Sequence, residues 1–346
     1  MDPAQLLSDL TAGRTAALAR AISVVENARP GFEQLLAGIH PRLGHARRIG
    51  ITGPPGAGKS TLTERLVAAW RAQGLRVAVV AVDPTSPFSG GALLGDRIRM
   101  ESIALDRGVF IRSMATRGSL GGLATTTREV CDVLDAAAFD RILVETVGVG
   151  QSELDVGRSA DSTVLVLVPE SGDGIQTLKS GIMEIADVFV VNKADRPGAE
   201  KLRQEIEVTL GIRQGNAFRN VRAHHGFRGK VSRPASPETA AGPKAWAQPV
   251  VLTVAAKGEG IDELASALDA HYASLESSGG LMERRRRRFV ERTREVVERA
   301  ARRWVWSETG AQRHIDERLD DIVAGRASPY EVAAEVLEEL KQGERV

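Results

Sequence analysis

Short apolar runs alternate with amphipathic stretches between residues 46 and 275. Several of these runs are almost continuous and rich in valine and isoleucine, which is typical of strands buried on both faces of a parallel sheet. The pattern predicts strands at 47–52, 76–82, 108–112, 140–144, 163–168, 187–192 and 249–254. Between most of them it predicts helices at 59–73, 120–137, 174–185, 199–210 and 260–274. We therefore expect an α/β domain with a mainly parallel sheet flanked by helices.

The two ends of the chain show helical spacing instead. Apolar residues recur at this spacing through the first 45 residues, beginning with Leu6, Leu7 and Leu10. Near the C-terminus an apolar stripe is formed by Phe289, Val296, Val297, Ala300 and Trp304. Such a stripe is too apolar for a free helix, so it must pack on the α/β domain or on another subunit. Of these two arrangements, we favour packing against a second copy of the chain, which would make the protein a dimer.

Two more helices are predicted after this stripe. The first ends near Gly325, a residue type that favours helix C-termini. The second is expected to begin with Ser328 as N-cap, Pro329 as its first residue and Glu331 as the reciprocal capping partner.

These patterns divide the chain into three parts. Residues 1–45 form a helical extension, residues 46–278 form the α/β domain, and residues 279–346 form a helical arm. A stretch rich in glycine and proline, 213–248, is expected to be a long surface insertion in the α/β domain.

Composition narrows the classes of function. The chain has 346 residues with 46 Lys plus Arg against 45 Asp plus Glu, so a global basic field for nucleic acid is absent. The run Arg284–Arg288 is better explained as a helix face for solvent or a partner. The adjacent His224 and His225 point to different sides of a chain, so a shared metal is not expected. The single cysteine, Cys131, excludes an internal disulfide and suits a reducing compartment.

No secretory signal is visible at the N-terminus, and no apolar run approaches the ~20 residues that span a bilayer. The sequence therefore predicts a cytoplasmic protein without a membrane partner.

The segment Gly53–Ser60, GPPGAGKS, matches the phosphate-binding loop pattern G-x-x-x-x-G-K-[ST]. It follows a predicted strand and precedes a predicted helix, which is the context that a phosphate loop requires. Its backbone N–H groups and the helix N-terminus favour an anion. Lys59 is expected to reach the β- and γ-phosphates, and Ser60 to ligate Mg²⁺. The residues predicted to bind nucleotide here are Pro55, Gly56, Ala57, Gly58, Lys59, Ser60 and Thr61.

A second motif indicates that the nucleotide is GTP. Asn192, Lys193 and Asp195 fit N-K-x-D directly after a predicted strand. The Asp195 carboxylate can accept from the N1–H and N2–H₂ groups of guanine, whereas adenine would leave it unpaired. Lys193 is expected to lay its stem over the base, and Asn192 to tie this loop to the phosphate loop. After the last strand, a backbone N–H for guanine O6 is expected from Ala255, Ala256 and Lys257.

Two carboxylates end other predicted strands. Asp83 follows the strand 76–82 and Glu145 follows the strand 140–144, at the sheet edge where α/β proteins bind ligands. Both are candidate Mg²⁺ ligands, directly or through water. Glu145 begins an E-x-x-G segment in which Gly148 can donate its N–H to the γ-phosphate.

Several segments together resemble the MeaB/ArgK/MMAA family, the G-protein chaperones of B12-dependent acyl-CoA mutases. They are the phosphate loop, the N-K-x-D motif, Ala81–Ser86, Leu94–Met100 and the specific stretch Val144–Glu153, VETVGVGQSE. The resemblance covers most of the chain. It implies a homodimeric, Mg²⁺-dependent GTPase whose C-terminal helices form the dimer.

The resemblance also implies that GTP binding and hydrolysis gate adenosylcobalamin loading and protect the mutase, which carries the cobalamin. An adenosyltransferase is a candidate further partner. Asp83 and Asp96 are assigned by resemblance to a first switch with Mg²⁺-linked roles. Residues 145–153 are assigned to a second switch, which contains Gln151 as a candidate for positioning water, and residues 170–179 to a third switch that communicates with the mutase.

Two departures leave the client open. The chain has Gly172-Asp173-Gly174-Ile175-Gln176 where much of the family has an acidic residue at the third position. The insertion 213–248 is also longer than expected for chaperones of methylmalonyl-CoA mutase. An isobutyryl- or hydroxyisobutyryl-CoA mutase is therefore also a candidate client.

Three other functions remain open from the residues alone. They are a GTP- or ATP-dependent metabolite kinase, a nickel metallochaperone GTPase, and a scaffold that binds the mutase without turnover. One cysteine and six scattered histidines argue against the nickel site. The intact Lys59, Ser60 and Asp195 argue against a pure scaffold.

Overall fold

The computed structural model describes residues 2–84, 100–116, 122–146, 156–157, 159–169, 182–213 and 246–341. The chain divides into two compact units, Met1–Arg285 and Arg286–Val346. The predicted insertion lies almost entirely outside the described residues, as do His224, His225 and the first part of the helix expected at 174–185. Within the described part of the chain, no helix combines the length and the apolar character needed to cross a membrane.

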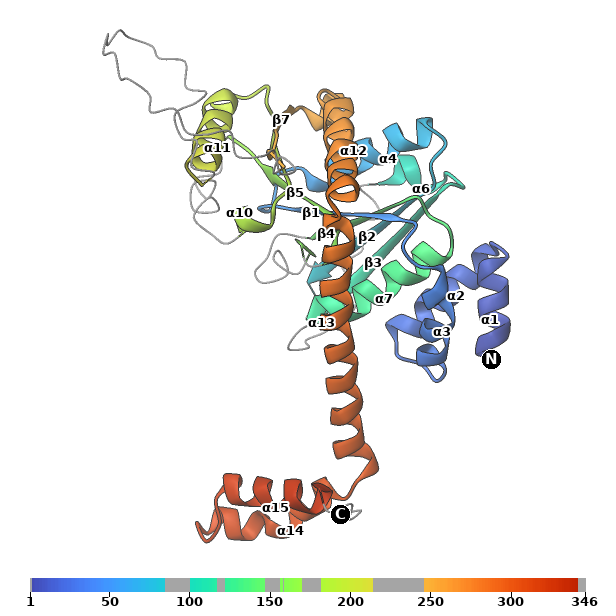
Figure 1. Ribbon diagram of the computed structural model, residues 1–346, viewed down its shortest axis with the longest axis vertical. Coiled ribbons are helices and arrows are strands. Elements are labelled where there is room, and N and C mark those ends of the chain that lie inside the picture. The colour runs from blue at the N-terminus through green and yellow to red at the C-terminus, as the bar shows by residue number, and fades with distance from the viewer. Residues whose placement is uncertain are drawn as a thin grey trace, which may run out of the picture. The chain divides into compact units, whose positions relative to one another are not determined.

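A seven-stranded parallel sheet forms the centre of the first unit, in the order β3-β2-β4-β1-β5-β6-β7 (Figure 1). Every neighbouring pair of strands is parallel, which confirms the predicted fold class. The strands are β1 Arg47–Thr52, β2 Val77–Pro84, β3 Val109–Thr116, β4 Arg141–Thr146, β5 Ser162–Leu167, β6 Val188–Asn192 and β7 Val250–Thr253.

Helices cover both faces of this sheet because its strands are apolar on both faces. The described helices of the first unit are α1 Pro3–Thr11, α2 Thr15–Glu26, α3 Phe32–Ile39, α4 Lys59–Ala72, α6 Glu101–Ala104, α7 Gly122–Ala136, α10 Ile182–Ile185, α11 Ala199–Arg213 and α12 Ile261–Ser278. Short 3₁₀ turns lie at His40–Arg42 and Ala255–Lys257.

Strand β2 shows how the two faces are filled. Its residues Ala78, Val80 and Val82 share a buried core with α7 and the N-terminal helices α1 to α3. The alternate residues Val77 and Val79 point into a second core with α4 and α12. Figure 1 shows these two groups of helices on opposite sides of the sheet. The N-terminal helical extension therefore completes one layer of the α/β unit.

The C-terminal region contains α13 Gly280–Arg303, α14 Ala311–Val323 and α15 Pro329–Lys341, with a π-helical turn at Trp304–Glu308. The predicted capping of α15 is confirmed. The backbone N–H of Ser328 donates to Glu331 Oε2 over 2.7 Å, and the N–H of Glu331 donates to Ser328 Oγ over 3.2 Å. This reciprocal pair satisfies two N–H groups that the helix start would otherwise leave unpaired.

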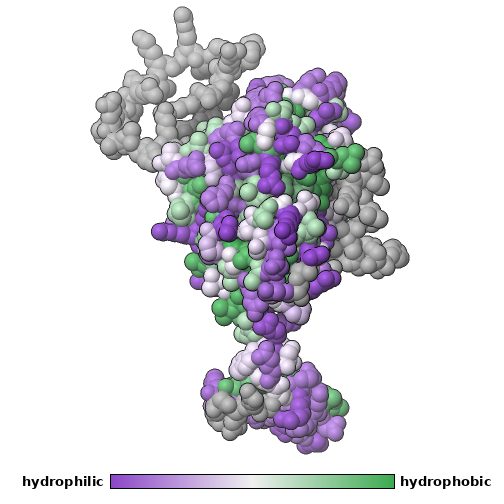
Figure 2. Space-filling model, turned by 90° about the vertical axis from the view of Figure 1, so that its right-hand side faces the viewer, coloured by the Kyte–Doolittle hydropathy of each residue, from purple (hydrophilic) through white to green (hydrophobic). Residues whose placement is uncertain are grey.

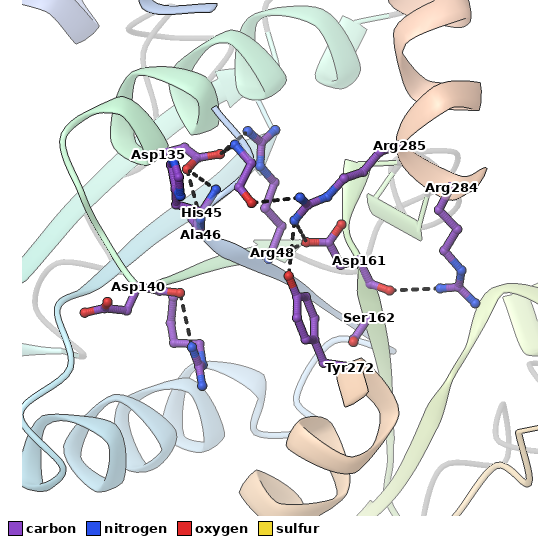
Figure 3. A network of polar contacts seen from close by, with 12 residues as sticks. His45, Ala46, Arg48, Asp135, Asp140, Asp161, Ser162, Tyr272, Arg284 and Arg285 are labelled. Carbon is purple, nitrogen blue, oxygen red and sulfur yellow. Dashed lines mark hydrogen bonds and ion pairs between the residues drawn. The ribbon is translucent and has the colours of Figure 1, made fainter. Parts of the chain in front are cut away.

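A network of charged residues holds the edge of the sheet at which the strands begin (Figure 3). Asp135, at the end of α7, accepts backbone hydrogen bonds from Gly44, His45 and Ala46 over 2.9 to 3.1 Å. The side chain of Arg48 reaches the same carboxylate over 3.3 Å. One buried acid therefore fixes the chain between the N-terminal helices and β1.

The first two arginines of the run Arg284–Arg288 bind acids at this sheet edge, which corrects in part the expectation of a solvated or partner-binding face; the side chain of Arg284 is 38% exposed and that of Arg285 is 17% exposed. Arg284 forms a two-pronged contact with Asp187, with distances of 2.8 and 3.0 Å. Arg285 donates to Gly44 O over 2.7 Å and lies 3.6 Å from Asp161 (Figure 3). The sequence could not show this because the acids come from the starts of distant strands.

Asp187 gives a prediction about acid stability. Burial pushes the pKa of this carboxyl upward, but contacts with His271 and Arg284 outweigh burial and hold the pKa below its ordinary value. A group whose pKa is lowered by folding stabilises the fold above its unfolded pKa, about 3.9, and loses that effect as the pH falls through the folded pKa. Asp187→Asn should therefore lower the free energy of unfolding by about 3 kcal/mol at neutral pH.

The difference between the two proteins should shrink as the pH falls below about 4. Urea unfolding of wild type and Asp187→Asn at pH 7, 5, 4 and 3 measures this difference. A gap that stays constant across the series would show that the Asp187 charge does not stabilise the fold.

Candidate functional site

The phosphate-binding loop lies between the end of β1 and the start of α4, and two of its glycines are sterically required. Gly53 has φ of +140°, and a Cβ there would lie 2.1 Å from Val166 O on the neighbouring strand. Gly58 has φ of +87°, and a Cβ there would lie 2.4 Å from Asn192 Nδ2. A side chain at position 53 would push the loop away from β5, and one at position 58 would displace the amide of Asn192. The loop can therefore lie close to both β5 and the N-K-x-D segment.

Lys59 is the first residue of α4, and its side chain folds back over the loop. Its ammonium donates to Gly53 O over 2.8 Å and to Pro54 O over 3.0 Å, and the residue is only 6% exposed. The positive charge and the helix N-terminus thus meet at one place. This is the charge arrangement that a polyphosphate requires.

Glu145 lies at the end of β4, next to β1, and its carboxylate faces the phosphate-loop helix. Oε1 accepts from Ser60 Oγ over 2.6 Å, and Oε2 accepts from Thr63 Oγ1 over 3.0 Å. The glutamate is 4% exposed. Two residues that the sequence suggested separately as Mg²⁺ ligands are therefore in direct contact, and their hydroxyl and carboxylate oxygens are the ligand types that Mg²⁺ prefers.

Thr63 is a site residue that the sequence motifs did not reveal. It is fully buried and supports the second oxygen of Glu145. The available signal was its position three residues after Ser60, because residues at this spacing share one face of a helix.

Several other predicted site residues cannot be placed in full. The backbone of Asp83 lies on β2, paired with Ala115 of β3, at the same strand-end edge as Glu145. The Asp83 side chain lies outside what the structure describes, and so do Asp96, Gly148, Gln151 and residues 170–179. Their roles stay predictions.

The N-K-x-D segment follows β6 and contacts the phosphate loop. Asn192 donates from Nδ2 to Ala57 O over 2.8 Å, which is the tie between the two loops that the sequence predicted. Its Oδ1 accepts from Thr253 Oγ1 over 3.0 Å and from the N–H of Ala255 over 3.1 Å. Buried Asn192 therefore connects the phosphate loop, β7 and the loop after β7.

Lys193 adopts a left-handed backbone conformation, with φ of +57°, which is uncommon for a residue with a side chain. Its ammonium donates to Gly56 O over 2.9 Å, so its stem crosses from the N-K-x-D segment to the phosphate loop. An extended alkyl stem in this place can cover the face of a flat base.

A cavity of about 220 Å³ lies where these segments meet. The phosphate-loop region, the N-K-x-D segment and the loop after β7 all contribute to its lining, which consists of Gly58, Thr61, Asn192, Lys193, Asp195, Arg196, Val254, Ala255, Ala256 and Lys257. Asp195 Oδ2 lies 3.3 Å from Lys257 Nζ at this cavity. Residues separated by more than 130 positions in the chain thus converge on one concave surface with a carboxylate beside it.

The three backbone N–H groups of the turn Ala255–Lys257 differ in availability. The N–H of Ala255 donates to Asn192, and the N–H of Lys257 donates to Val254 O over 2.8 Å. No acceptor among the described residues takes the N–H of Ala256. Of the three predicted amides, Ala256 is therefore the one that is open to a base.

Comparisons with known proteins agree with this geometry. A sequence model of the family described as "Methylmalonyl Co-A mutase-associated GTPase MeaB" matches residues 18–309. A Pyrococcus abyssi protein named as a GTPase is 47% identical over 293 residues, covering 85% of this chain and 83% of the relative. The mouse mitochondrial methylmalonic aciduria type A homolog is 40% identical over 205 residues, covering 55% and 49%.

A solved structure titled "LAO/AO transport system kinase" has a TM-score of 0.65 and 29% identity, covering 98% of this chain and 97% of the other. The phosphate loop, the N-K-x-D segment and the parallel sheet all lie within the residues that the family matches. The chain therefore belongs to the MeaB family of methylmalonyl-CoA mutase-associated proteins and is a P-loop GTPase.

Proposed function

We propose that this GTPase is a chaperone that gates adenosylcobalamin loading into a B12-dependent acyl-CoA mutase and protects that enzyme from inactivation. The observation that carries the nucleotide part is the joining of the phosphate loop to a base-sized cavity through Asn192. The family description, which names a methylmalonyl-CoA mutase, supports the partner. The client is a methylmalonyl-, isobutyryl- or hydroxyisobutyryl-CoA mutase, and an adenosyltransferase is a second candidate partner.

The hydrolytic step is attack of water on the γ-phosphate, and the residues of the chain position and neutralise charge. Lys59 and the loop N–H groups hold the β- and γ-phosphates. Ser60, Asp83 and Glu145 are the proposed holders of Mg²⁺, which supplies charge neutralisation across the phosphates. Gly148 donates its N–H to the γ-phosphate, and Asp96 acts in the first switch.

Glu145 offers a direct test of the proposed metal site. Glu145→Gln keeps the size of the side chain but removes its charge, so the site should hold Mg²⁺ more weakly. We expect kcat to fall by about 10- to 100-fold. When GDP binding is measured at increasing Mg²⁺ concentrations, the concentration that gives half of the maximal effect should be higher.

Thr63→Val is the matched control, because it removes one hydrogen bond to the same carboxylate and leaves its charge in place. It should have a smaller effect on the Mg²⁺ dependence. Equal Mg²⁺ titrations for wild type and Glu145→Gln would exclude Glu145 from the metal site.

Guanine recognition follows from the cavity lining. Asp195 accepts from N1–H and N2–H₂, the N–H of Ala256 donates to O6, and the Lys193 stem covers the ring. Ala255 and Lys257 complete the turn. In this arrangement the base and the phosphates contact segments that Asn192 already connects.

We also propose that the C-terminal helices form a homodimer. Apolar side chains on α13 and the following turn are exposed in one chain: Val297 by 60%, Trp304 by 45% and Trp306 by 49%. On the face that Figure 2 shows, hydrophilic residues predominate in this region and hydrophobic residues lie among them. Exposed tryptophans of this kind favour a protein interface.

The double change Val297→Glu and Trp304→Glu is therefore expected to convert the dimer to monomer. Sedimentation velocity at about 10 μM measures the state, because a loss of about 3 kcal/mol raises Kd by more than 100-fold. Val208→Glu, at a 43% exposed position on α11 and outside the C-terminal helices, is the control. A wild-type protein that sediments as a monomer would exclude this interface.

The partner proposal is tested by co-purification. Tagged protein loaded with GDP or with a non-hydrolysable GTP analogue is mixed with each candidate mutase, and the captured mutase is quantified. We expect capture of one client and a change in capture between the two nucleotides. The steady-state GTPase rate should also change when that client is added, and unchanged rates with every candidate would contradict the proposal.

A second candidate function is a metabolite kinase, because the solved structure of similar fold is titled as a transport system kinase. The two functions differ in where the γ-phosphate goes. With γ-labelled GTP, the GTPase releases labelled phosphate, whereas a kinase labels a small acceptor.

A further inference from the structure

Arg65 connects the helix of the phosphate loop to the turn that faces the proposed base. It lies on α4, six residues after Lys59. Its Nε donates to Ala255 O over 3.2 Å, and its Nη2 donates to Ala256 O over 3.0 Å. One guanidinium therefore holds two successive carbonyls of the turn Ala255–Lys257, in the forked geometry that arginine provides.

Because Arg65 holds these carbonyls, it also fixes the direction of an N–H group. In a planar trans peptide the C=O and the N–H point in opposite directions. The carbonyl of Ala255 and the N–H of Ala256 belong to the same peptide unit. Because Arg65 draws the carbonyl toward α4, the N–H of Ala256 is turned away from α4.

Two further hydrogen bonds constrain the turn. Gly258 N–H donates to Ala255 O over 3.1 Å and so acts on the same peptide, and Asn192 Oδ1 accepts from the N–H of Ala255, in the preceding peptide. A single 3₁₀ turn is short and has few hydrogen bonds of its own. Arg65 supplies two more, and it supplies them from the helix that begins at the phosphate site.

We propose that Arg65 is a positioning residue for base recognition, which aims the N–H of Ala256 at the O6 atom of guanine. This inference rests on the proposed guanine cavity. Arg65 itself does not line the cavity, so it acts through the backbone of the turn. It also ties the position of that turn to the helix whose first residues hold the phosphates.

The test compares two nucleotides that differ at one atom. GDP carries oxygen at position 6, and 6-thioguanosine diphosphate carries sulfur, which is a weaker acceptor, while both keep N1–H and N2–H₂. Kd is measured for both nucleotides by calorimetry with wild type and with Arg65→Met, which keeps the stem but removes the donors. ADP is measured with wild type as a check on the cavity itself.

We expect Arg65→Met to weaken GDP binding by about three- to tenfold and to leave the binding of 6-thioguanosine diphosphate less changed. The preference for oxygen over sulfur should therefore shrink. Arg65→Lys keeps a charged donor group without the fork of the guanidinium, and it should restore part of that preference.

Arg71→Met is the matched control. Arg71 lies on the same helix and likewise donates to a carbonyl, Leu75 O over 2.6 Å, and to the carboxylate of Asp106. It does not contact the turn after β7, so the preference for oxygen over sulfur should be unchanged in this variant. Thermal unfolding of all variants verifies that they are folded.

Two results would overturn the inference, and they have different meanings. If Arg65→Met weakens both guanine nucleotides by the same factor, or neither, Arg65 has no role in aiming the N–H of Ala256. If wild type binds ADP as tightly as GDP, the assignment of the cavity to guanine is wrong, and the proposed role of Arg65 is then wrong as well.

Discussion

Lys59→Met is expected to lower kcat/KM for GTP hydrolysis by about 10³-fold. The ammonium is nearly buried and is held by Gly53 O and Pro54 O, so it needs little reorganisation to meet a polyphosphate. Lys59 is the only lysine in the sequence of the phosphate-loop helix α4. A neutral side chain of similar length cannot neutralise the charge that develops on the γ-phosphate and the leaving oxygen.

The measurement is phosphate release under single-turnover and steady-state conditions, combined with Kd for GDP. Lys201→Met is the matched control, because its side chain is 81% exposed on α11 and its ion pair with Glu205 is exposed as well. It should behave as wild type. If Lys59→Met hydrolyses GTP within threefold of wild type while folded, the phosphate loop does not perform the proposed chemistry.

Asp195→Asn should change which purine the protein accepts. The wild-type carboxylate offers two acceptors to the N1–H and N2–H₂ groups of guanine. An amide offers one acceptor and one donor, so guanine loses a contact and faces a donor, whereas xanthine presents a carbonyl at that position. We expect GTP affinity to fall by about 10²- to 10³-fold and XTP affinity to rise.

A binding assay in which GTP and XTP compete measures this change in nucleotide preference. The ion pair between Asp195 and Lys257 is exposed, so its loss should have little effect on stability. Asp262→Asn, at an exposed position in the first turn of α12, is the control and should keep the guanine preference. Unchanged preference in Asp195→Asn would place the base elsewhere.

The sequence predicted those features that depend on residues lying close together along the chain. The Val/Ile-rich runs predicted all seven described strands, because a strand buried on both faces must be apolar throughout. Six agree within one or two residues at each end, whereas β3 ends at Thr116, four residues beyond the predicted end at 112. The capping of α15 was predictable because the bonded pair Ser328 and Glu331 and the first helical residue Pro329 lie within four residues of the chain. The glycines of the phosphate loop also follow a fixed spacing, because one loop must turn several N–H groups toward one anion.

Contacts between distant segments were not predictable in the same way. Asp135, Asp161 and Asp187 are ordinary acids in sequence, but strand order brings them to one sheet edge, where they hold backbone N–H groups and the start of α13. The run Arg284–Arg288 likewise gave no sign that its first two members point inward. Such contacts depend on the strand order β3-β2-β4-β1-β5-β6-β7, which no local pattern encodes.

The amino-acid sequence by itself determined the α/β class, the phosphate loop and the N-K-x-D motif, because each depends on residue types at short, regular spacing. Only the tertiary structure decided that Thr63 supports Glu145, that Ala256 has the open N–H, and that Arg65 holds its peptide. These roles arise where β1, β4, β6 and β7 end beside α4. Strand order and register determine which side chains meet at the edge of a sheet. The spacing of residues along the chain determines only the helices and strands that carry those side chains.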